Sequence, residues 1–162
     1  MVWTNTRPVV LAGRAGGWRQ TSTVWELVVV RRRCNHDAVK INHQVVVFDA
    51  ADLSAESKFW AGVFGGTVDA QDEWHMVLVD GKPRVGVQLA PDHVPPDWPD
   101  GTPKQQIHLD LWVDDVDAAH EKVMSLGARV LKAAADSDSA DNYQVYADPA
   151  GHPFCLCWVK AG

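Results

Sequence analysis

One order of predicted elements occurs twice in the chain, in residues 43–90 and again in residues 105–159. In each part a short strand leads into a helix that stops at a glycine, and three further strands follow. The two helix stops are Gly65 and Gly127. A repeated strand–helix–three-strand order (βαβββ) predicts an α+β protein built from two similar modules.

The first module begins with an apolar strand at residues 44–48, just after His43. Asp52 or Ser54 is placed to cap the helix that follows, because short polar side chains accept hydrogen bonds from the first free N–H groups of a helix. Three strands are predicted next, at residues 67–70, 74–79 and 84–89. The dipeptide Asp80-Gly81 between the last two is a strong signal for a hairpin turn.

The second module has the same order. Asp114 and Asp115 cap a helix whose apolar residues recur at helical spacing. Three strands then follow, with a polar loop at residues 136–142, and they are predicted at residues 128–134, 143–147 and 154–159.

The opening strand of the second module, in the stretch QQIHLDLWVDD (105–115), alternates strictly. Such alternation predicts a half-buried strand with an apolar core face, formed by Ile107, Leu109, Leu111 and Val113. The opposite face carries His108, Asp110 and Trp112. An imidazole, a carboxylate and an indole side by side predict that this strand forms one wall of a cavity.

Charge and proline content divide the chain. Residues 1–40 carry seven Lys/Arg and two Asp/Glu, whereas the remainder carries 8 basic and 19 acidic residues. We therefore expect residues 1–40 to be a basic extension outside the fold, or a start site placed too early. The composition of this extension also resembles a transit peptide, and its three consecutive arginines would suit an anionic partner.

Residues 41–160 are the expected domain, and the proline-rich residues 91–104 are the linker between its modules.

Composition excludes several classes of protein. A hydrophobic content of 46% with 22% charged residues is ordinary for a globular protein. No apolar run reaches the roughly 18 residues that span a bilayer, so no membrane partner is expected. The acidic domain is a poor match for nucleic acid, because phosphate contacts need a basic surface. Three cysteines do not make a disulfide framework, which favours a reducing, cytoplasmic location.

Three stretches of the chain resemble a known superfamily. They are FWAGVFG (59–65), QQIHLDLWVDDVDAAHEKVMSLGARVL (105–131) and DPAGHPFCLC (148–157). They are similar to the vicinal oxygen chelate superfamily, in particular its glyoxalase-like and bleomycin-resistance-like branch. The resemblance implies two tandem βαβββ modules whose mixed sheets are cupped around a cavity. It leaves open whether the protein is a monomer or a homodimer that exchanges modules.

The resemblance also implies where a metal would bind, since enzymes of this superfamily take ligands from the first and last strand of each module. The corresponding positions here are Val45, Gln88, His108 and Cys155. That set is poor for Ni²⁺, Fe²⁺ or Mn²⁺, which need about three His or carboxylate donors, so no cofactor is expected. If a divalent metal does bind, His108, Cys155 and Asp110 form the conceivable set, and it suits zinc best.

The function expected from these residues is binding of a small organic molecule between the modules. The expected ligand-binding residues are His108, Asp110, Trp112, Gln88, Cys155 and Trp60. One alternative is a lyase, isomerase or dioxygenase that uses His108, with Asp110 or Cys155, as general base or metal ligand. A second alternative is a dimerisation or interaction module in which the cavity is vestigial. Trp98 in the linker is a further candidate for the cavity wall.

Overall fold

A computed structural model describes residues 39–134 and 141–159 of the chain. The fold described below belongs to the unit Ile41–Gly162. The predicted basic extension lies almost entirely outside the described residues. No helix in the described ranges is long and apolar enough to cross a membrane.

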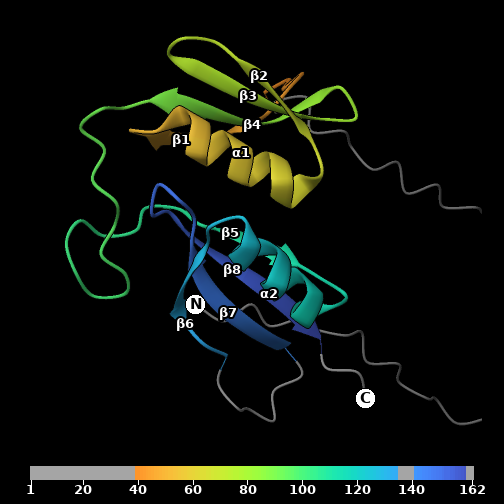
Figure 1. Cartoon of the computed structure of the whole chain (residues 1–162), viewed down its shortest axis with the longest axis vertical. Coiled ribbons are helices and arrows are strands. Elements are labelled where there is room, and N and C mark those ends of the chain that lie inside the picture. Colours follow the sequence, from red (N-terminus) through yellow and green to blue (C-terminus); the bar gives the residue numbers. More distant parts are fainter. Residues whose placement is uncertain (1–38, 135–140, 160–162) are drawn as a thin grey trace, which may run out of the picture. The chain divides into compact units, whose positions relative to one another are not determined.

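The first module folds as one four-stranded mixed sheet with a helix against it (Figure 1). Its elements are β1 (Val46–Ala50), α1 (Leu53–Phe64), β2 (Thr67–Ala70), β3 (Trp74–Val79) and β4 (Lys82–Leu89). The strand order is β1-β4-β3-β2, in which β1 pairs with β4 in parallel and the other pairs are antiparallel. The predicted hairpin turn is present, with positive φ angles at Asp80 and Gly81.

The second module repeats this topology. Its elements are β5 (Leu109–Trp112), α2 (Val116–Ser125), β6 (Arg129–Lys132), β7 (Asp141–Ala147) and β8 (Pro153–Val159). The order β5-β8-β7-β6, with β5 parallel to β8, corresponds strand by strand to the first sheet. The predicted α+β fold of two βαβββ modules is therefore confirmed.

Both helices begin at the aspartates expected from the sequence. Asp52 Oδ1 accepts a hydrogen bond from the Ala55 N–H at 2.9 Å, and Asp115 Oδ1 accepts one from the Ala118 N–H at 3.0 Å. Asp52 rather than Ser54 is therefore the cap of α1. Helix α1 ends at Gly65, which has a left-handed conformation with φ 66° that glycine adopts without steric cost.

Strand β5 is shorter than its alternating sequence predicts. Ile107 was expected on the core face, but it precedes the strand and is 66% exposed. Pairing begins at Leu109, opposite Phe154, because the preceding residue of β8 is Pro153, which has no N–H to donate. Strand β7 in turn begins at Asp141, within the predicted polar loop.

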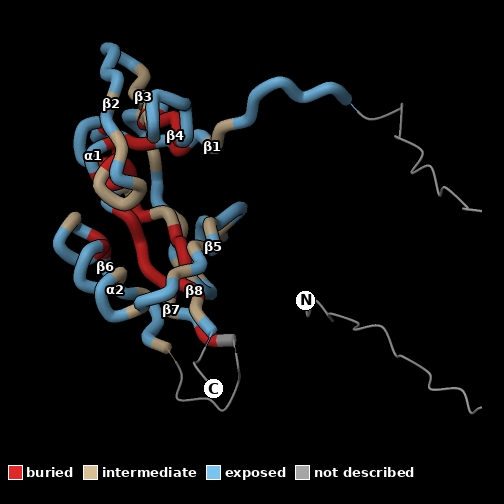
Figure 2. Tube along the Cα trace, turned by 90° about the vertical axis from the view of Figure 1, so that its right-hand side faces the viewer, coloured by how far each residue is buried: buried red, intermediate tan, exposed pale blue. Residues whose placement is uncertain are grey.

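Side chains from both modules form one aromatic core around α1. Trp60 of α1 stacks on Phe48 of β1 with ring centroids 5.0 Å apart, and it meets Phe154 of β8 edge-on at 5.5 Å. Trp60 is fully buried, and Phe59 and Phe154 are each 1% exposed. Figure 2 shows the buried stretches of the trace in red, including part of β8. Helix α1 thus packs against the strands of both modules.

Candidate functional site: a cavity on the second sheet

A cavity lies over the face of the second sheet that carries His108 and Asp110, and its volume is about 400 Å³. Strands β5, β7 and β8 supply most of its wall, and the linker and the residues just before β5 supply the rest. The lining residues are Trp98, Gln105, His108, Asp110, Trp112, Asn142, Tyr143, Val145, Pro153, Cys155 and Cys157.

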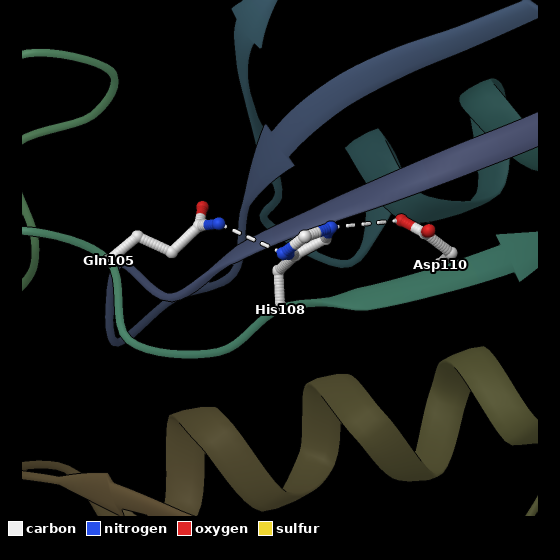
Figure 3. Close-up of polar contacts among 3 residues, drawn as sticks. All are labelled: Gln105, His108 and Asp110. Atoms are coloured by element: carbon white, nitrogen blue, oxygen red, sulfur yellow. Dashed lines mark hydrogen bonds and ion pairs between the residues drawn. The ribbon is translucent and has the colours of Figure 1, made fainter. Parts of the chain in front are cut away.

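His108 is held between two polar neighbours (Figure 3). The Gln105 side-chain nitrogen lies 2.9 Å from His108 Nδ1, and His108 Nε2 lies 3.3 Å from Asp110 Oδ1. In the neutral tautomer that carries its proton on Nε2, Nδ1 accepts a hydrogen bond from the Gln105 amide and the Nε2 proton faces Asp110. Both side chains remain open to solvent, with 41% of His108 and 52% of Asp110 exposed.

Two cysteines of β8 form the floor of the cavity. Cys155 and Cys157 are 7% and 6% exposed, and they pack with Val145, Trp98 and Leu131. Burial, and after it the nearby Asp110 carboxylate, raise the pKa of Cys155 to about 12 and that of Cys157 to about 11. Both groups are therefore neutral thiols at neutral pH. A neutral thiol is a poor nucleophile, which argues against covalent catalysis here.

His108, Asp110 and Cys155 also offer three donor atoms that lie within 4.8 Å of one another. Asp110 and Cys155 are paired in the register of β5 and β8, which explains their proximity. A nitrogen, an oxygen and a sulfur suit Zn²⁺, which accepts all three donor types in a tetrahedral site with one open position. They suit Fe²⁺, Ni²⁺ or Mn²⁺ less well.

Two of the expected ligand-binding residues lie elsewhere. Trp60 does not line this cavity, because α1 packs between the two sheets and its indole is fully buried in the core. Its indole N–H donates to Glu56 Oε1 at 2.7 Å. Gln88 lines a different cavity of about 540 Å³, on the first sheet, together with Asp49 and His93. Val45 lines a third cavity.

Several lining residues were not expected from the sequence. Tyr143 and Val145 alternate on β7 and face the cavity, a period-two signal that the predicted strand at residues 143–147 already contained. Gln105 and Asn142 carry no comparable signal. Gln105 reaches His108 only because of the path taken by the residues before β5.

Other histidines pair with hydroxyl groups away from this cavity. Ser57 Oγ lies 2.8 Å from His75 Nδ1, but Ser57 is fully buried, so no substrate can reach its hydroxyl. His120 Nδ1 lies 2.8 Å from the Tyr146 hydroxyl, and Tyr146 is also fully buried. Both pairs are structural contacts within the fold.

Two βαβββ modules with a cavity on the face of one sheet define the vicinal oxygen chelate class of proteins. The family model described as "Glyoxalase-like domain" matches residues 45–157, and the chain belongs to this glyoxalase-like family. Comparison with curated proteins found no match.

Solved structures show the same fold at low identity. A glyoxalase/bleomycin resistance protein/dioxygenase family enzyme from Burkholderia phytofirmans PsJN is 19% identical, with a TM-score of 0.55 over 72% of this chain and 97% of that chain. The fosfomycin resistance protein FosX from Listeria monocytogenes is 13% identical, with a TM-score of 0.56 over 75% and 96%. FosX from Mesorhizobium loti is 17% identical, with a TM-score of 0.53 over 75% and 95%.

Proposed function

We propose that the protein binds a small organic molecule in the cavity on β5, β7 and β8. The main support for this proposal is that three aromatic rings and two solvent-accessible polar groups line the same cavity. Trp98, Trp112 and Tyr143 supply the rings, and His108 and Asp110 supply the polar groups. Ligand sites combine apolar walls with a few placed polar groups in this way.

The geometry favours binding over acid–base catalysis. A general base needs a free lone pair within reach of its substrate. In the neutral tautomer described above, the lone pair of His108 Nδ1 already accepts a hydrogen bond from Gln105. His108 and Asp110 therefore act as groups that orient the ligand, with Cys155 as a small apolar contact beneath it.

Fosfomycin does not follow from the likeness to FosX. Fosfomycin is a phosphonate, and phosphonate oxygens are bound most strongly by Arg, Lys or a metal. The lining of this cavity contains no Lys or Arg. The shared fold is therefore no reason to assign the same ligand.

A second candidate function is a zinc-dependent lyase, isomerase or dioxygenase activity at the same place, favoured by the donor cluster of His108, Asp110 and Cys155. Bound zinc would supply Lewis-acid chemistry there. Metal analysis of protein purified without chelators separates the two candidates. Stoichiometric zinc that is lost in Cys155→Ser would support the second candidate, and substoichiometric metal supports the first.

The domain limits and the assembly are part of the proposal. We place the domain at residues 41–160, outside the basic extension, and expect a chain that begins at residue 41 to bind the same compounds. Exposed apolar side chains of both modules, among them Val47 and Val130 at 42% and 37% exposure, suit a homodimer. Light scattering tests this, since a monomer at micromolar concentration would contradict it.

Thermal-shift screening against a library of small aromatic compounds tests the binding proposal. Hits should stabilise the wild-type protein, and Asp110→Asn should reduce the shift. Asp69→Asn is the matched control, because Asp69 is an exposed aspartate on β2 that does not line the cavity. If no compound shifts the melting temperature, or if both variants behave like wild type, the proposal is wrong.

A further inference from the structure

We propose that the ligand of this cavity is an organic cation, an amine-bearing aromatic molecule that places its positive group against Asp110. This inference rests on the proposed function and adds the chemical class of the ligand. Two features of the described residues support it: the charges of the lining and its aromatic rings.

The charge of the lining is one-sided. Asp110 is the one carboxylate among the lining residues, and no lysine or arginine accompanies it. His108 beside it is charged only when protonated, and in its neutral form it leaves the charge of Asp110 uncompensated. Arg84 lines two neighbouring hollows that Asp110 also borders, and Lys122 lines one of them, but among the described residues neither forms an ion pair with Asp110.

The aromatic rings suit a cation as well as an apolar group. The faces of tryptophan and tyrosine rings attract cations, and this attraction strengthens when water is excluded. The Lys132 ammonium already lies 5.3 Å from the centre of the Tyr143 ring, so Trp98 and Trp112 are the rings left for a ligand cation. Trp112 lies two residues from Asp110 on the same strand and is 61% exposed. A ligand can therefore meet the carboxylate and an indole face together.

The acidic balance of residues 41–162 adds a negative field at longer range, which disfavours an anionic ligand and favours a cationic one.

Three indole compounds whose short side chains end in groups of different charge test the inference: tryptamine (cation), tryptophol (neutral) and indole-3-acetate (anion). Titration calorimetry on the full chain at neutral pH should show affinity in that order. We expect tryptamine to bind about 10-fold more tightly than tryptophol, the range that one ion pair and one cation–π contact provide. Asp110→Asn should lower the affinity for tryptamine to about that for tryptophol and so remove this preference, and Asp69→Asn should leave the preference unchanged.

Equal or tighter binding of tryptophol or indole-3-acetate would overturn the inference and leave the proposed function standing. A preference for tryptamine that survives in Asp110→Asn would overturn it too, since the cation would then be held elsewhere. If none of the three compounds binds, the inference is wrong, and the library screen separately decides the proposed function. Circular dichroism of each variant confirms that the exposed substitution leaves the fold intact.

Discussion

The carboxyl groups of Glu56 and Asp148 are both buried, and they belong to different modules. Glu56 lies on α1 and is fully buried, and Asp148 precedes β8 and is 3% exposed. Glu56 accepts hydrogen bonds from the Trp60 indole N–H at 2.7 Å and from the Ala150 N–H at 3.0 Å. Asp148 Oδ1 accepts the His152 N–H at 2.7 Å. Oδ2 has no donor among the described residues, and it hydrogen-bonds to Glu56 when Asp148 is protonated.

This pair predicts a specific dependence of stability on pH. Burial, and then the charge of Glu56, raise the pKa of Asp148 to about 9, so the folded protein keeps this proton while the unfolded chain loses it near pH 4. The contribution of Asp148 to the free energy of unfolding is therefore fully present below pH 4. It is lost as the pH rises through 9, by at most about 1.4 kcal/mol per pH unit. Asp148→Asn, which resembles the protonated acid, should make the unfolding free energy fall less steeply with pH. Urea unfolding at a series of pH values measures it, and an unchanged slope would contradict the shared burial of the two acids.

Two glycines with positive φ should differ in their tolerance of a methyl group. Gly65 has φ 66° and open space where a Cβ would lie, whereas a Cβ on Gly151, at φ 94°, would collide with Pro95 of the linker. Gly65→Ala should therefore cost about 1 kcal/mol of unfolding free energy, from backbone strain alone. Gly151→Ala should cost clearly more, because strain and collision combine. Equal costs in denaturant titrations would show that the linker does not pack on this turn.

The order of elements could be predicted from the sequence because its signals are local. Helix caps, the Asp-Gly turn and the alternation of single strands each depend on a few neighbouring residues. The positions of Gln88 and Trp60 depend instead on how the two modules pack. Spacing along the chain grouped Gln88 with His108, but the structure places them over different sheets. Trp60 was expected at the cavity, but it is buried because α1 contacts strands of both sheets, and no local sequence signal shows these contacts.

The tautomer of His108 can be observed directly. Because Gln105 donates to Nδ1, nitrogen NMR of the neutral ring should show the proton on Nε2. Gln105→Leu removes this donor and should increase the population with the proton on Nδ1. A wild-type ring protonated mainly on Nδ1 would contradict the arrangement in Figure 3.

The cavity thiols should react slowly with disulfide reagents such as dithionitrobenzoate. In a Cys34→Ser background only Cys155 and Cys157 are observed, and their raised pKa values leave very little thiolate at pH 8. Asp110→Asn removes one cause of the raised pKa, so the reaction should become faster, with the larger effect at Cys155. Asp69→Asn is the control and should leave the rate unchanged. Rapid reaction of the folded wild-type protein would contradict the burial of these thiols.

The most direct test of the cavity as a binding site is the set of tryptophan indole N–H signals in a proton–nitrogen NMR spectrum during titration with tryptamine. Trp98 and Trp112 line the cavity, whereas Trp60 is buried in the core and donates to Glu56, so it serves as an internal control. The signals of Trp98 and Trp112 should move with one saturating curve while that of Trp60 stays in place. Saturating shifts confined to other tryptophans, or no shifts at all, would contradict binding of an organic cation in this cavity.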